Sequence, residues 1–131
     1  MRGEKYLSKP QQYALVYNEG SSWVSRLVVM KALPNGLSWS RYGLSVSKKV
    51  GNAVTRNRVK RLLREILRVE TLKSGWDIVF IARPAVANAD YSSLKRAVDS
   101  LLSRAYLLES DEKRGLQGEV GSGVVDSYRL N

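Results

Sequence analysis

Apolar and polar residues alternate along the chain with two different periods, and these periods predict where helices and strands lie. Two segments carry apolar side chains three and four positions apart, the spacing of one helix face: one follows the suitable cap Asn52 and ends near residues 70–74, and the other follows the suitable cap Asp90 and covers residues 91–108. The first stripe consists of Val59, Leu62, Leu63, Ile66 and Leu67. The second consists of Leu94, Ala97, Val98, Leu101, Leu102 and Ala105. Both segments are predicted to be helices that pack on a common core.

Three further runs have the composition of strands. Residues 23–33 are rich in valine and leucine, and residues 41–47 alternate, with Tyr42 and Leu44 facing inward. Residues 76–83 are almost continuously apolar, as in a central strand covered on both faces. We expect the first two strands to form an antiparallel pair, because a Pro-Asn-Gly turn follows the first. Strands joined by a crossover helix usually lie parallel, so we expect this of the second and third.

Another helix is predicted near the N-terminus. Ser8 is a suitable cap, Pro10 fits the first turn, and the helix should run to about residue 18 and end at Gly20. The order is then helix-strand-strand-helix-strand-helix. This order indicates an α/β (α+β) two-layer sandwich with a mixed central sheet and the helices on one side of it. We expect one domain over residues 1–109 and a flexible tail over residues 110–131, where apolar content falls.

Charge is concentrated in one window of the sequence. The chain has 131 residues, 22 Lys+Arg and 12 Asp+Glu, giving a formal net charge of +10. Residues 41–68 alone hold nine bases and one acid, a net charge of +8. The predicted helix in this window carries its cations opposite its apolar stripe, so it can bind a polyanion while packing on a sheet. A single cation of this helix is most simply explained as a solvated surface residue. For the whole set of cations, binding of a polyanion is the favoured interpretation.

Several classes of function are disfavoured. The sequence has no cysteine and no histidine, which removes thiolate chemistry and the commonest general base and metal ligand. Its carboxylates have structural roles as caps or ion-pair partners, so catalysis by the protein alone is disfavoured. No apolar run is long enough to span a bilayer and no signal peptide is visible, so we expect a cytoplasmic protein. A membrane-surface helix is the other polyanion option, but so small a domain needs the apolar stripe as core.

Single-stranded RNA fits better than DNA. No helix-turn-helix, zinc-finger or zipper spacing is present. The outward positions of residues 41–47 are small, and Tyr13 and Tyr17 share a face of the first helix. Either tyrosine could be a stacking platform for a base, although helix aromatics more often face the core.

The segment of residues 43–65 closely resembles the signature of the bacterial ribonuclease P protein component. It combines the lead-in Lys48-Lys49-Val50-Gly51-Asn52-Ala53-Val54, the triplet Arg56-Asn57-Arg58, and the bases Lys60, Arg61 and Arg64. The resemblance includes Tyr13, Tyr17 and Gly20 and the strand at residues 77–83, and it covers roughly residues 7–107. Many family members have phenylalanine where this chain has the two tyrosines.

The resemblance implies a protein subunit that binds the catalytic RNA of ribonuclease P and the 5′ leader of precursor tRNA. The RNA would perform the cleavage with Mg²⁺ ions that are bound chiefly by the RNA itself. The protein would be a monomer in the holoenzyme and would not associate with a membrane. The β-α-β crossover of its fold would be left-handed. The residues implied to bind the catalytic RNA are Lys48, Lys49, Asn52, Arg56, Asn57, Arg58, Lys60, Arg61, Arg64 and Arg68. Those implied to line the leader cleft are Tyr13, Tyr17, Arg41, Ser45 and Ser47.

Two alternatives stay open at this point. One is a general RNA-binding or ribosome-associated protein of the same fold, and the other is a protein nuclease. The sequence also leaves open which tyrosine is exposed, whether the protein binds a metal ion, its oligomeric state when free, and the role of residues 110–131.

Overall fold

A four-stranded mixed sheet lies at the centre of the computed structural model, which describes residues 5–109. The elements in chain order are α1 (Pro10–Glu19), β1 (Ser21–Val24), β2 (Val28–Pro34), β3 (Arg41–Ser45), α2 (Ala53–Arg68), β4 (Trp76–Ala82), the 3₁₀ helix η1 (Pro84–Asn88) and α3 (Tyr91–Arg104). The α+β class and the mixed sheet agree with the prediction. The tail predicted for residues 110–131 lies outside the described residues.

The strand order differs from the predicted one. The sheet runs β1-β2-β4-β3, with β2 antiparallel to β4 and β3 parallel to β4. The parallel arrangement across the α2 crossover is confirmed. The expected pairing of β2 with β3 is wrong, because β4 lies between them. The apolar run of β4 explains this position, since a strand buried on both faces is most stable at the centre of the sheet.

The run of residues 23–33 is not one strand. It folds back at Ser25–Leu27, and β1 pairs with β2 in a hairpin that joins Val24 to Val29 and Trp23 to Met30. The Ser25 hydroxyl donates to the carbonyl of Val28 at 2.8 Å and accepts from its N–H at 3.1 Å. This turn contains no glycine or proline, so the continuous apolar pattern concealed it.

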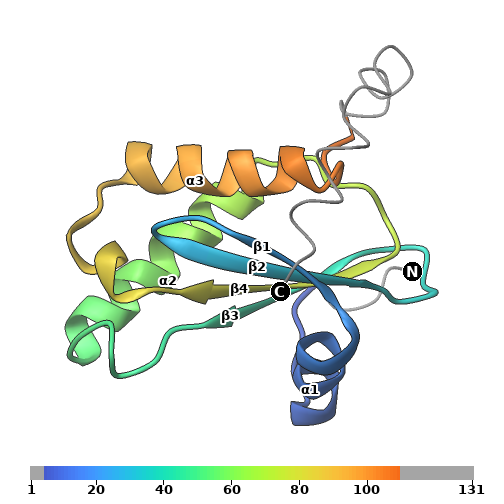
Figure 1. The fold of residues 1–131 in the computed structure, drawn as a ribbon, viewed down its shortest axis with the longest axis horizontal. Helices are drawn as coiled ribbons and strands as arrows, with labels where there is room; N and C mark the ends of the chain where they lie inside the picture. The colour runs from blue at the N-terminus through green and yellow to red at the C-terminus, as the bar shows by residue number, and fades with distance from the viewer. Residues whose placement is uncertain (1–4, 110–131) are drawn as a thin grey trace.

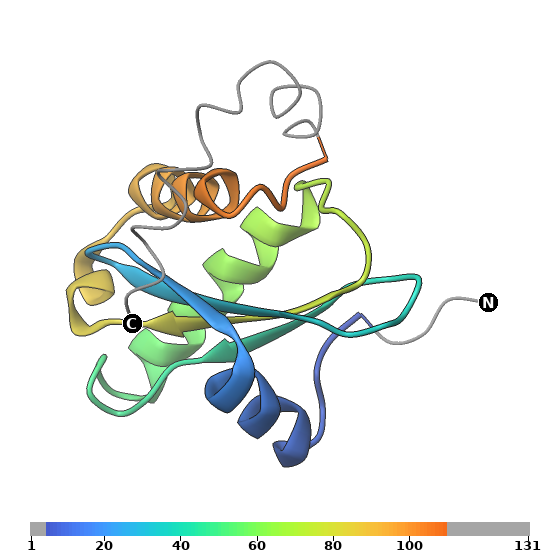
Figure 2. The same ribbon diagram turned by 45° about the vertical axis from the view of Figure 1, so that its right-hand side comes forward.

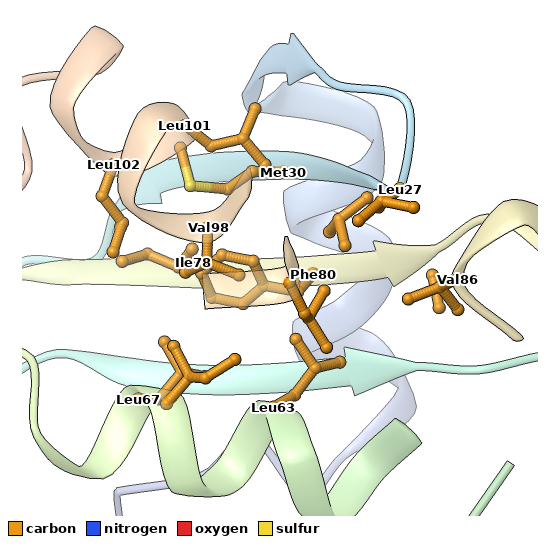
Figure 3. Packing of buried hydrophobic residues seen from close by; sticks show 14 of the residues in the cluster. Leu27, Met30, Leu63, Leu67, Ile78, Phe80, Val86, Val98, Leu101 and Leu102 are labelled. Carbon is orange, nitrogen blue, oxygen red and sulfur yellow. The ribbon is translucent and has the colours of Figure 1, made fainter. Parts of the chain in front are cut away.

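Helices lie on both sides of the sheet, which corrects the expected single layer of helices. Figures 1 and 2 show α1 on the opposite side of the sheet from α3. Leu63 of α2 and Leu101 of α3 join Ile78 and Phe80 of β4 in the main core, as Figure 3 shows. Val79 lies between those two β4 residues and faces the other side of the sheet. It packs against Leu7 and against Val16 of α1. The alternation of β4 side chains thus supplies a core on each face.

The ends of the helices are fixed by local hydrogen bonds. Asn52 caps α2 by accepting from the N–H of Thr55 at 2.9 Å, as expected, and Asp90 caps α3 at Ser93. Ser8 does not cap α1, whose cap position is Lys9. There the side-chain carbonyl of Gln12 accepts the N–H groups of both Ser8 and Lys9. Reaching back from the first turn, Gln12 satisfies donors that a serine hydroxyl was expected to satisfy.

Candidate nucleic-acid interface

The basic face of α2 is fixed in place by the buried opposite face of the same helix. Val59, Leu63 and Ile66 have no exposed surface, so the register of the helix on the sheet is set. The intervening positions then point outward, and the helix sequence holds six bases and one acid. Within residues 5–109, no hydrogen-bond or ion-pair partner is found for the side chains of Lys60, Arg61, Arg64 and Arg68. These cations form a face available to phosphates.

The arginines of the Arg56-Asn57-Arg58 triplet have a second role. Arg56 Nε donates to the carbonyl of Gly51 at 3.1 Å, which ties the helix to the loop before it. The guanidinium of Arg58 donates to the carbonyls of Ala87 and Ala89, which ties α2 to η1. Asn57 between them is exposed. In this conformation Arg58 holds two parts of the chain together, whereas Asn57 projects outward.

The loop before α2 presents more polar side chains. Ser47, Lys48, Lys49 and Asn52 are exposed, while Val50 is buried and anchors the loop to the core. Gly51 has a φ of 156°, and a Cβ there would lie 3.1 Å from Thr55. Glycine is therefore favoured at this turn.

The face of the sheet that carries α1 is only partly covered. Gly43 and Val79 are neighbours on β3 and β4, and both are buried beneath α1. The next row outward on this face consists of Ser45, Ile81, Val29 and Val24, joined by the strand register. None of these four residues is buried, and Val24 is 39% exposed. We call this row the open strip.

Tyr13 and Tyr17 lie on α1 with their ring centres 6.5 Å apart and their planes at 45°. Tyr17 is 37% exposed, whereas Tyr13 is half-buried. The Tyr13 ring packs directly on Gly43, where an added Cβ would lie 2.6 Å from a ring carbon. The two tyrosines therefore differ: Tyr13 fastens α1 to β3, and Tyr17 exposes more of its ring.

Arg41 does not project freely from the sheet. Its Nε and one terminal nitrogen donate to the two carboxylate oxygens of Asp77 at 2.8 and 2.7 Å. Asn35 donates to the same carboxylate at 2.9 Å. Both side chains of the ion pair are largely buried, with 20% of Arg41 and 7% of Asp77 exposed. Arg41 thus fixes the start of β3 against β4.

Sequence reasoning missed the apolar floor of the open strip and one further aromatic residue. Ile81, Val29 and Val24 belong to runs read as core, and only the strand register together with their partial exposure places them in one open row. Tyr6 lies in a segment that pairs with the edge of β3, where it forms a parallel bridge to Tyr42 and is 40% exposed. No periodic pattern marks so short a segment.

Residues 5–109 contain neither a cluster of metal ligands nor a membrane-spanning helix. Histidine and cysteine are absent, and no group of three or more acidic side chains there could hold a metal ion. None of the helices in that range is both long and apolar enough to cross a bilayer.

Comparison with known proteins gives a consistent result. The sequence profile of a family described as Ribonuclease P matches residues 1–106. A ribonuclease P protein component from Dehalococcoides mccartyi (strain CBDB1) is 48% identical over 114 residues, 86% of this chain and 95% of that protein. The protein of the same name from Caldanaerobacter subterraneus subsp. tengcongensis is 45% identical over 109 residues, 82% of this chain and 94% of its own length.

Solved structures agree with the sequence relatives. The Staphylococcus aureus RNase P protein superposes with a TM-score of 0.76 at 29% identity, covering 82% of this chain and 100% of that chain. The RNase P protein from Thermotoga maritima gives a TM-score of 0.68 at 30% identity, covering 75% of this chain and 96% of that chain.

Proposed function

Because this chain belongs to the ribonuclease P protein family, we propose that its basic helix binds the catalytic RNA of ribonuclease P and its open strip binds the 5′ leader of precursor tRNA. Membership of this family shows that the chain is a protein component of an endoribonuclease that processes the 5′ ends of tRNA. The chain therefore has an RNA partner.

The assignment of α2 to the catalytic RNA rests on the set of cations that have no partner within residues 5–109. Lys60 and Arg64 are one helical turn apart, Arg61 lies next to Lys60, and Arg68 extends the exposed surface by one further turn. A row of this length suits successive phosphates of a folded RNA, and an arginine fork can hold one phosphate through two hydrogen bonds. Asn57 adds a hydrogen-bonding group between the charges.

The assignment of the open strip to the leader rests on its shape and composition. An extended single strand needs a shallow path with an aromatic platform and nearby positive charge. Tyr17 lies beside Tyr13, which packs on Gly43 two residues before Ser45. Ser45 supplies a small polar residue on β3, and the exposed Ser47, Lys48 and Lys49 follow it in the chain. Arg41 stays a predicted cleft residue, although its guanidinium is bound by Asp77.

In this proposal the chemistry belongs to the RNA. Mg²⁺ in the holoenzyme would be bound chiefly by RNA phosphate oxygens, which are the hard ligands that this ion prefers. The protein would contribute binding: its cations offset repulsion between the catalytic RNA and the precursor, and the open strip holds the leader in place. One copy of the chain supplies both surfaces, so we propose a monomer in the holoenzyme.

The observation that carries the proposal is the cationic face of α2, whose side chains have no partner within residues 5–109, and salt dependence tests it. Substituting Lys60, Arg61, Arg64 or Arg68 by alanine should weaken binding to the catalytic RNA. Each lost phosphate contact should reduce the slope of log affinity against log salt by about 0.7–0.9. Arg26→Ala, an exposed arginine in the β1–β2 turn, is the matched control and should leave the slope unchanged. An unchanged slope for all four variants would reject the helix as the docking face.

A cleavage assay separates the alternatives. Purified protein, precursor tRNA and Mg²⁺ are mixed with and without the catalytic RNA. We expect cleavage only when the RNA is present, with the protein increasing affinity for the precursor. Cleavage by the protein alone would indicate a protein nuclease. If the protein failed to stimulate the RNA, a general RNA-binding or ribosome-associated role would replace the proposed one.

A further inference from the structure

A small hollow lies at the edge of β3, between α1 and the outer face of α2. Its volume is about 240 Å³, and its walls include Tyr6, Tyr13, Tyr42, Leu44, Lys60 and Arg64. Tyr42 and Leu44 pair with Ile78 and Phe80, whose side chains enter the core beneath α2 and α3. Tyr13, which packs on Gly43 from the α1 side, also lines the hollow, so the hollow lies at the sheet edge between α1 and α2.

The aromatic wall is held by backbone hydrogen bonds. The N–H of Tyr42 donates to the carbonyl of Lys5 at 2.8 Å, and the N–H of Leu7 donates to the carbonyl of Tyr42 at 2.6 Å. These bonds add residues 5–7 to the edge of β3 as a short extra strand. Tyr6, between them, packs against the Tyr42 ring with centres 5.9 Å apart and planes at 60°, and it still leaves 40% of its surface exposed. Its ring is thus positioned but not covered.

Another part of the lining is cationic. Lys60 and Arg64 come from adjacent turns of α2, and neither has a protein partner within residues 5–109. A hollow lined by both an aromatic face and two cations can receive one nucleotide, with the base stacked and the phosphate neutralised. Ligand pockets for drug-sized molecules are about 300–1,000 Å³. The smaller hollow fits one base better than two.

We infer that this hollow is a nucleotide subsite that takes one unpaired nucleotide of the catalytic RNA, with its base on Tyr6 and its phosphate between Lys60 and Arg64. The inference rests on the proposed function of α2, because both cations belong to that docking face. The catalytic RNA is favoured over the leader because the charged part of the lining, Lys60 and Arg64, belongs to the docking face of α2. Tyr6 is then a binding residue that neither the motif nor the periodicity indicated.

Binding of the full chain to the catalytic RNA, measured over a range of salt concentrations, tests the subsite. Tyr6→Ala should weaken binding roughly 5- to 140-fold if one base is stacked. It should leave the salt slope unchanged, because no charge is removed, whereas Arg64→Ala should lower the slope. Tyr6→Phe keeps a stacking face and should restore the affinity. Tyr91→Ala, which truncates a tyrosine of similar exposure on α3, is the matched control and should bind as the unsubstituted chain does.

Two further measurements make the result decisive. In the Tyr6→Ala background, Arg64→Ala should weaken binding less than it does alone, because both side chains hold the same nucleotide. The ratio of holoenzyme affinities for precursors with and without a leader should be unchanged by Tyr6→Ala. A change in that ratio alone would assign the hollow to the leader and overturn the inference.

The remaining outcomes separate this inference from the proposed function. Unchanged RNA affinity in Tyr6→Ala, with weakened binding in Arg61→Ala, would overturn the subsite and leave the docking face of α2 intact. Unchanged affinity in both would overturn both. An equal loss in Tyr6→Ala and Tyr91→Ala would also overturn the subsite, because it would show a general effect of truncation. Thermal unfolding of each variant confirms that the compared proteins are folded.

Discussion

Tyr42 connects three parts of the molecule at the scale of a single residue. Its backbone holds the N-terminal segment on β3, its ring contacts Tyr6, and its side chain is 6% exposed among core residues. Burial raises the pKa of its hydroxyl above the usual 10.0, and the nearby Tyr6 and Glu70 raise this pKa further. The neutral form is therefore favoured in the folded state.

This shift predicts a dependence of stability on pH. Since the folded-state pKa is raised, its stabilising contribution is complete below pH 10.0 and is lost as pH rises through the folded pKa. Tyr42→Phe removes this titration. As the pH rises from 8 to above 10.0, the free energy of unfolding of the variant should therefore increase relative to that of the unsubstituted chain. Urea unfolding at matched salt measures the difference. Tyr91→Phe, on the surface of α3, controls for loss of a tyrosine hydroxyl, and equal pH trends in the two variants would contradict the prediction.

The arginines show what a motif can and cannot predict for single residues. The triplet identified the family and the helix, but not the direction of each guanidinium. Arg58 bonds to carbonyls of Ala87 and Ala89, about 30 positions away in the sequence, and Arg41 bonds to Asp77, which is 36 positions away. Local spacing contains no information about acceptors so distant. Only the exposed positions of α2, which follow from helical periodicity, could be placed from the sequence.

At the scale of elements, the packing of α1 on β3 depends on Gly43. A Cβ at this position would lie 2.6 and 2.8 Å from two carbons of the Tyr13 ring and 3.0 Å from a methyl group of Leu7. No side-chain carbon can occupy that space unless the ring moves. The small outward residues of this strand, visible in the sequence, thus allow a helix aromatic to reach the backbone of the sheet.

Gly43→Ala should therefore displace Tyr13 and destabilise the fold by about 1–3 kcal/mol, the usual cost of overpacking. Chemical denaturation measures this change. In a Tyr13→Ala background the same substitution should cost less, because the ring that it would meet is absent. Additive costs in the double variant would show that the ring does not limit this position.

Elements with strong periodicity were predictable and those set by tertiary pairing were not. The apolar stripe of α2 and its Asn52 cap were both identified, because they depend on residues within one helix. The β1–β2 hairpin and the insertion of β4 between β2 and β3 were missed, because these depend on which strands compete for the centre of the sheet. The open strip depends on that register, so it too was beyond local analysis, apart from Ser45.

At the scale of the whole molecule, the sheet separates two surfaces with different chemistry. The cations of α2 lie on the side of the main core, and the open strip lies on the side of α1. Electrostatic binding on one side depends on salt, whereas stacking on the other depends on contact with bases. The two contributions should therefore be separable in one holoenzyme.

Tyr17→Ala and Arg61→Ala test this separation. Tyr17→Ala should weaken binding of leader-bearing precursor by about 1–3 kcal/mol and leave the salt slope of assembly with the catalytic RNA unchanged. Arg61→Ala should lower that slope by about 0.7–0.9 and leave the leader preference unchanged. Leu15→Ala, which truncates an exposed residue of α1 outside the tyrosine face, is the control for Tyr17. Because Tyr17 lies on α1 and Arg61 on the exposed face of α2, with the sheet between the two helices, the double variant should show additive losses within about 0.5 kcal/mol. A larger coupling would mean that the leader and the catalytic RNA meet on one continuous surface, which would contradict the division made by the sheet.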